Sequence, residues 1–112
     1  EKEKPLENNQ ILLLDEFLEN LSLGLENHKT ELNKTKIDEI QSEINLLQEN
    51  LTNQNKIEVV EKFSKILAKI KKLGTKFLKE FITQGSKELI SKGIKFLIEQ
   101  GPTIIEEIGK HH

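Results

Sequence analysis

Apolar residues recur every three or four positions along most of this 112-residue chain. That spacing gathers them on one face of an α-helix, whereas a half-buried strand needs strict alternation of apolar and polar residues. No window of the sequence alternates in this way, and runs rich in β-branched and aromatic residues are missing. The periodicity therefore predicts an all-α fold.

Breaks in the periodicity divide the chain into five predicted helices. Polar segments separate the first three helices, and the apolar phase changes at Gly85 and Ser86, which fit a helix end followed by an N-cap. A Gly-Pro pair at 101–102 ends the fourth helix. The predicted helices span about 6–23, 35–51, 55–84, 86–100 and 102–109.

A chain of 112 residues is long enough for one domain and too short for two ordinary ones, which predicts a single domain over residues 1–110. We expect a small antiparallel helical bundle of four to five helices with one long central helix. The apolar content of 35% is low for a globular chain, and such chains often complete their core by self-association. The closing His111 and His112 are interpreted as the remnant of a purification tag.

The predicted third helix, 55–84, is the long central one. Its apolar stripe keeps the same phase on both sides of Gly74. We therefore expect the helix to run through this glycine, even though glycine inside a helix costs about 1 kcal/mol relative to alanine. With a rise of about 1.5 Å per residue, the helix should outrun the two preceding ones by about 20 Å. Its apolar end then needs cover from elsewhere.

Lysines follow the opposite side of the same predicted helix. This basic face consists of Lys65, Lys69, Lys72, Lys76 and Lys79. All 17 basic residues of the chain are lysine, which is typical of a low-GC genome. Residues 1–52 are net acidic and residues 53–112 are net basic. A solvated back of a core helix, an acidic partner and an anionic lipid surface all fit this pattern.

Residues with catalytic or metal-binding chemistry are scarce in the sequence. The chain has no Cys, and its one internal histidine, His28, lies in a polar segment where we expect it to be solvated. Metal-ligand spacings and glycine-rich phosphate loops are missing. We therefore expect no enzyme activity, no metal and no cofactor. The net charge of -2 and the lack of arginine argue against nucleic acid as a partner.

Membrane-spanning and targeting signals are not found in the sequence. The longest unbroken apolar run is Ile11 to Leu14, far shorter than a transmembrane helix. The chain begins at Glu1, and the sequence does not tell whether a leader or a lipid-bearing segment has been removed. The location stays undetermined, with the cytoplasm favoured over a secreted or lipid-anchored form.

Two hypotheses of function follow from these patterns. In the first, the protein is a non-enzymatic helical interaction protein, of the adaptor, immunity or accessory type, that forms a dimer with itself or binds another helical protein. We expect the interface within 73–108, with fold-back of the C-terminal helices onto a monomeric core as the competing outcome. Its residues are Leu73, Phe77, Phe81, Ile90, Ile94, Leu97 and Ile98. In the second hypothesis, the segment 56–100 binds or inserts into anionic lipid.

Overall fold

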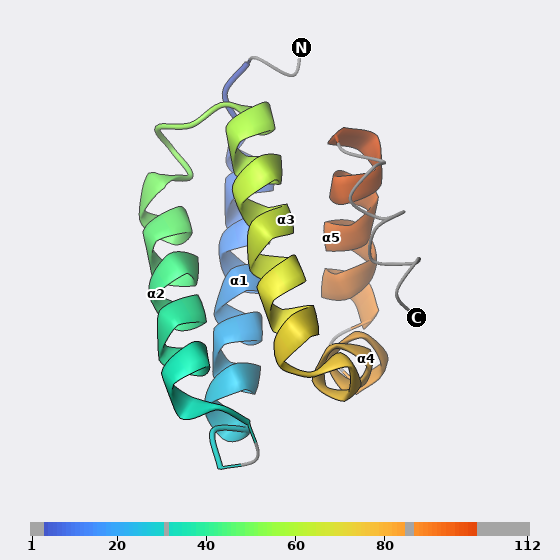
Figure 1. Cartoon of the computed structure of the whole chain (residues 1–112). Coiled ribbons are helices and arrows are strands. Elements are labelled where there is room, and N and C mark those ends of the chain that lie inside the picture. Colours follow the sequence, from blue (N-terminus) through green and yellow to red (C-terminus); the bar gives the residue numbers. More distant parts are fainter. Residues whose placement is uncertain (1–3, 31, 85–86, 101–112) are drawn as a thin grey trace.

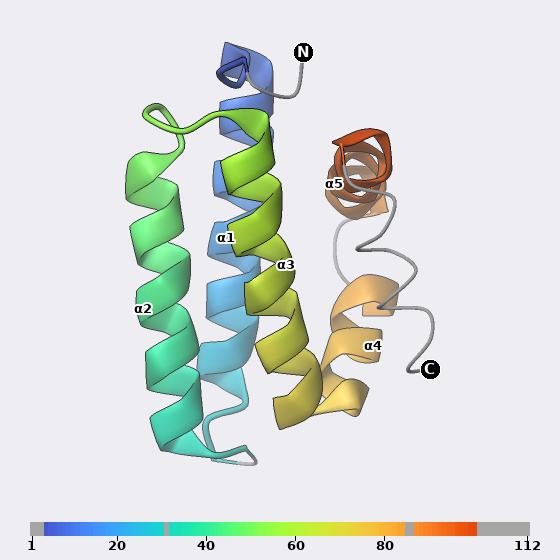
Figure 2. The same ribbon diagram turned by 45° about the horizontal axis from the view of Figure 1, so that its top comes forward.

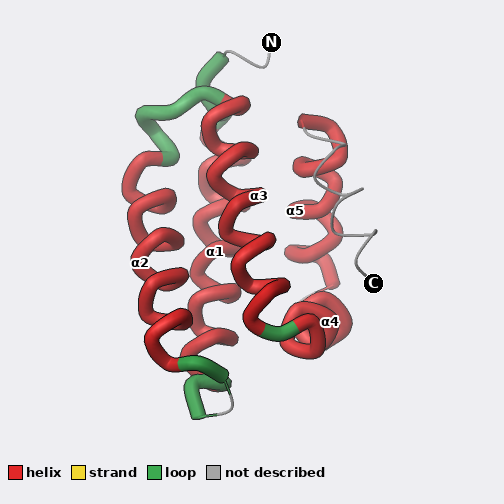
Figure 3. Tube along the Cα trace, in the orientation of Figure 1, coloured by secondary structure: helices red, strands yellow, loops and turns green. Residues whose placement is uncertain are grey.

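Five helices make up the structure, a computed structural model that describes residues 4–30, 32–84 and 87–100, without the side chains of residues 82, 84, 94 and 97–100. The helices are α1 (Asn8–Asn27), α2 (Lys34–Asn50), α3 (Lys56–Leu73), α4 (Thr75–Gln84) and α5 (Lys87–Gln100). Short loops join them, and the described residues form no strand (Figure 3). The predicted all-α bundle is confirmed. The predicted helix at 102–109 and the tag remnant lie outside the described residues.

The first three helices run side by side in alternating directions and form an antiparallel unit (Figures 1 and 2). They are similar in length, with 20, 17 and 18 residues. α2 packs against both neighbours, and α1 faces α3 across the core, where the rings of Phe17 and Phe63 lie 5.4 Å apart. Each of the three helices turns one apolar stripe inward, as its periodicity predicted.

Asparagine side chains begin α2 and α3. The Lys36 N–H donates to the Asn33 side chain, so α2 begins just before the predicted position 35. Asn55 begins α3 as predicted: the Glu58 N–H donates to the Asn55 side chain, and the Asn55 N–H donates to the Glu58 carboxylate. α1 runs past its predicted end at 23, because Leu25 continues the buried stripe of that helix.

The prediction of one long helix through Gly74 is wrong. α3 ends at Leu73, Gly74 has φ -171° and ψ 105°, which is extended backbone, and α4 begins at Thr75. Glycine is a weak helix former, which makes a break at this position inexpensive. The change of direction also lets Phe77 and Phe81 of α4 reach α1 instead of continuing along the axis of α3.

The last two helices fold back onto the three-helix unit, so α3 does not outrun its neighbours. α4 leaves the end of α3 in a new direction and is seen end-on in Figure 1. α5 packs on α1 and α3 at a steep inclination, and Figure 2 shows it end-on while α1, α2 and α3 are seen from the side. Leu78, Leu89 and Phe96 are buried and join the core. The radius of gyration of 13.3 Å agrees with the roughly 13 Å of a compact domain of this size.

Aromatic rings connect these two helices to α1. Phe17 contacts Phe63 of α3 and Phe81 of α4, with ring centroids 5.4 and 5.6 Å apart. Phe81 stacks on Phe77 at 6.4 Å, and the Phe77 ring lies edge-on to His28 at 5.2 Å. Ring pairs in these geometries add to the stabilisation from burial alone. The rings thus extend from the centre of the bundle to the turn after α1.

Two glycines allow α4 and α5 to approach α1. A Cβ atom at Gly24 of α1 would lie 3.2 Å from Cζ of Phe77. A Cβ atom at Gly93 of α5 would lie 2.5 Å from Cδ2 and 2.7 Å from Cε2 of Phe17, which is too short for a real contact. α5 is therefore seated directly on the Phe17 ring at Gly93.

Candidate interaction groove

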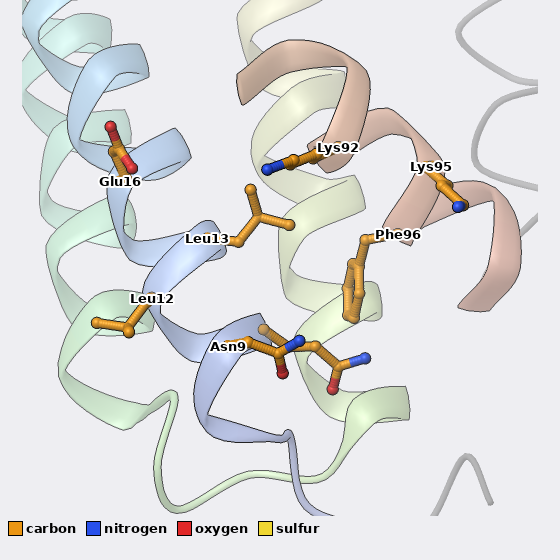
Figure 4. Close-up of a pocket in the computed structure, with 8 residues that line it drawn as sticks. Asn9, Leu12, Leu13, Glu16, Lys92, Lys95 and Phe96 are labelled. Atoms are coloured by element: carbon orange, nitrogen blue, oxygen red, sulfur yellow. The ribbon is translucent and has the colours of Figure 1, made fainter. Parts of the chain in front are cut away.

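An open groove runs between α1 and α5 beside the Gly93 contact. Its volume is about 470 Å³. Residues of α1 line one side and residues of α5 line the other (Figure 4). The lining residues are Asn9, Gln10, Leu12, Leu13, Glu16, Lys92, Lys95 and Phe96.

The groove follows from the way α5 crosses α1. The helices touch where Gly93 meets Phe17, and their steep mutual inclination makes them diverge away from that contact. The lining residues of α1 all precede Phe17, while Lys95 and Phe96 follow Gly93, so these residues lie where the helices separate. One small residue thus sets both the contact and the opening beside it.

Apolar side chains form the inner part of the groove. Leu13 points from α1 toward α5, and Phe96 points from α5 into the space between the two helices (Figure 4). Phe96 is buried and Leu13 is partly buried. Leu12 points away from α5 and is 71% exposed, more than any other large apolar side chain that the structure describes. The groove therefore offers an apolar strip with an uncovered leucine at its margin.

The two rims of the groove carry opposite charge. Glu16 stands on the α1 rim, and Lys92 and Lys95 stand on the α5 rim. Lys92 donates a hydrogen bond of 2.9 Å to Glu88, and this bond lowers the pKa of the Glu88 carboxyl. Glu16 and Lys95 are exposed, and neither forms an ion pair with another residue in the described ranges. Both charges are therefore accessible to a partner.

A second hollow, of about 570 Å³, lies between the start of α2 and the end of α3. Lys36, Lys69 and Lys72 line it together with Glu39. Lys69 donates to Glu43 and lies 3.8 Å from Glu39, and the hydrogen bond to Glu43 raises the pKa of Lys69. The charge of Lys69 is thus balanced by α2, and the hollow is part of the contact between α2 and α3.

His28 is not the solvated residue that its polar surroundings in the sequence suggested. Its ring is partly buried, Nδ1 donates to the Gly24 carbonyl oxygen at 2.9 Å, and Nε2 lies 3.7 Å from the Glu80 carboxylate. Together with the edge-on contact to Phe77, these interactions attach the turn after α1 to α4. The sequence did carry a signal for this contact, because His28 follows Gly24 by four residues, a spacing that brings two residues together on a helix. The predicted helix end at 23 placed both residues outside the helix, so the spacing was not used.

The predicted interaction residues fall into two groups. Four of them pack within the chain itself, buried or partly buried: Leu73, Phe77, Phe81 and Ile90. The side chains of the other three lie outside the described residues: Ile94, Leu97 and Ile98. The role of all seven in an interaction stays a prediction. The open apolar surface that the structure describes instead includes Leu12 and Leu13 of α1.

The predicted basic face is exposed but divided between two helices. Lys65, Lys72, Lys76 and Lys79 are exposed, and Lys69 is the member that pairs with Glu43. Because the chain changes direction at Gly74, the lysines of α3 and those of α4 do not continue one straight stripe.

Metal centres and membrane-spanning helices are not found in the part of the chain that the structure describes. No group of three or more His, Asp or Glu residues within the described ranges is placed to hold a metal ion. None of the described helices combines the length and the apolar character needed to cross a membrane. Comparisons with protein-family models, with curated proteins and with solved structures give no match. The groove between α1 and α5 is therefore the candidate functional site.

Proposed function

We propose that the protein is a non-enzymatic helical interaction protein that binds a helix, from a second copy or from a different protein, in the groove between α1 and α5. The observation that carries the proposal is an apolar strip of Leu13 and Phe96, with exposed Leu12 at its margin and charged rims beside it. Helix-in-groove recognition uses this arrangement, since apolar anchors fill the groove and the polar rims fix the orientation. An adaptor, immunity or accessory role fits this mode of action.

The chemistry of the groove favours binding over catalysis. A general acid or base needs burial or a close partner that tunes its pKa to the reaction. Glu16, Lys92 and Lys95 are all exposed on the rims, and the described residues of the lining include no histidine, serine or threonine. Such charges orient a partner but are poorly placed to activate a nucleophile.

Site-specific photocrosslinking tests the proposal. A photoreactive amino acid replaces Leu12 at the groove margin and, in a matched variant, Leu46, which is 59% exposed on α2. We expect crosslinks in cells from position 12 to a second copy or to one defined helical protein, and none from position 46. Equal crosslinking at both positions, or none at position 12, contradicts the proposal.

The exposed lysines favour one alternative function, adsorption to an anionic lipid surface. A lysine near such a surface contributes about 1 kcal/mol, and four members of the basic face are exposed. Insertion is a larger step, because Phe77, Leu78 and Phe96 must first leave the core. The alternative is therefore surface binding by the lysines of α3 and α4.

Vesicle flotation separates the two forms of lipid binding. Binding to anionic vesicles that disappears at high salt supports adsorption, because salt screens exposed charges. Binding that resists salt indicates insertion of the apolar face of 56–100. If the protein acts through the groove alone, it should float with neither anionic nor neutral vesicles at physiological salt.

A further inference from the structure

We infer that the occupant of the groove is a second copy of this chain, bound about a two-fold axis that passes through the groove. The inference deepens the proposed function and depends on it, because it names the partner. Two features of one small surface carry it: the opposite charges of the rims and the apolar strip of Leu13 and Phe96 between them.

The charges of the rims make this surface self-complementary. A two-fold rotation places the α1 rim of one copy against the α5 rim of the other, and the reverse contact forms at the same time. Glu16 of each copy then faces Lys95 of the other. Within one copy, neither of these exposed side chains pairs with another residue that the structure describes. The dimer supplies both with a partner.

The apolar strips of the two grooves meet in this arrangement. Leu13 of each copy points from α1 toward α5, and Phe96 lines the same space from α5 (Figure 4). The two-fold rotation that pairs the rims also sets the two grooves face to face, so Leu13 of one copy lies over the groove of the other. Leu12 points away from α5 and is 71% exposed, so it lies at the outer edge of this contact.

A helix of uniform charge fits the groove less completely. An acidic helix attracts Lys92 and Lys95 but is repelled by Glu16, and a basic helix meets the opposite problem. Like charges brought together at an interface select against a partner. A second copy presents both signs in the required order by symmetry.

A charge-swap experiment on the full chain tests the inference. Light scattering from about 1 μM to about 1 mM measures the dissociation constant of the dimer. Glu16→Lys alone and Lys95→Glu alone each place two like-charge pairs in the interface, so each should weaken the dimer roughly tenfold. Mixed in equal amounts, the two variants should dimerise with the wild-type affinity, because every interface pair then joins one acidic and one basic side chain.

The matched control is Lys65→Glu, which makes the same change of charge on the exposed face of α3. It should leave the dissociation constant within about twofold of wild type. All three positions are exposed, so far-UV circular dichroism should show the same helix content in every variant.

Three results overturn the inference: a monomer mass at every concentration, a mixture that does not recover the dimer, or a loss with Lys65→Glu as large as with Lys95→Glu. Crosslinking from position 12 distinguishes this failure from failure of the proposed function. Crosslinks to a different protein support the groove as a binding site and rule out the second copy as its occupant. No crosslink at position 12 rules out both.

Discussion

Gly93 decides how closely α5 approaches the rest of the molecule. It is seated on the ring of Phe17, and that ring is itself held between Phe63 and Phe81. A methyl group at position 93 would therefore clash with a ring that is held on both sides and cannot easily move away. A methyl group at Gly74 meets the end of the flexible Leu32 side chain at 3.2 Å and Cβ of Phe77 at an ordinary contact distance of 3.8 Å. The same substitution should therefore act differently at the two glycines.

We expect Gly93→Ala to destabilise the fold. Overpacking of a filled site costs about 1–3 kcal/mol, which outweighs the gain of up to about 1 kcal/mol from replacing a glycine inside a helix. The midpoint of urea unfolding, followed by far-UV circular dichroism, should fall for Gly93→Ala and change less for Gly74→Ala. A midpoint of Gly93→Ala at or above that of wild type would show that α5 is not seated on Phe17.

Individual helices could be predicted from the sequence better than their ends and directions. The buried face of a helix depends on local spacing, so the apolar periodicity predicted helical structure throughout the described helices but joined α3 and α4 into one. The break at Gly74 has another origin, because Phe77 and Phe81 keep the same phase whether the chain runs straight or bends. Contacts with Gly24 and Phe17, far away in the sequence, select the bent course.

Lys29 connects the end of α1 to the start of α2. Its ammonium group lies 2.9 Å from the Glu26 carboxylate and 3.0 Å from the Asp38 carboxylate. The hydrogen bond from Lys29 lowers the pKa of Glu26 below 4.5, and the same bond raises the pKa of Lys29 above 10.5. The connection is therefore fully charged across the neutral range.

We expect the contribution of this connection to be lost in acid. A carboxyl group whose pKa is lowered in the folded state stabilises the fold above its unfolded pKa and ceases to do so as the pH falls through the folded value. Lys29→Gln should therefore lower the melting temperature at about pH 7 and have little effect at about pH 2. Lys36→Gln, an exposed lysine of the same region, serves as the control. Equal effects of Lys29→Gln at both pH values would contradict this account.

At the scale of the whole molecule, α4 and α5 fold back and their apolar residues complete the core beside α1. The sequence argued for self-association because the apolar residues beyond 73 lacked cover, and the fold-back covers Phe77, Leu78 and Ile90 within one chain. The candidate groove could not be predicted from the sequence. The position at which α5 crosses α1 decides which part of the apolar side of α1 stays open. That position is set by the contact between Phe17 and Gly93, and a contact between residues so far apart in the sequence leaves no periodic pattern.

We expect the helices to unfold as one cooperative unit with Phe17 at its centre. Truncation of a buried phenylalanine to alanine costs about 3–5 kcal/mol, a large part of the stability of a small domain. Phe17→Ala should lower the urea midpoint strongly with a single transition. Leu23→Ala, on the same helix but exposed and outside the groove, should change the stability by no more than about 0.5 kcal/mol. Two separate transitions in the wild type would show that α4 and α5 unfold independently of the first three helices.

The seat of Gly93 on Phe17 also has a consequence for how this fold can evolve. The two positions share one fixed volume, so each limits what the other can become: a larger residue at 93 costs least where a smaller one already stands at 17. Descendants of this chain that keep the crossing should show paired replacement at these sites. A lineage that enlarges position 93 while retaining phenylalanine at 17 must have moved α5, and with it the groove.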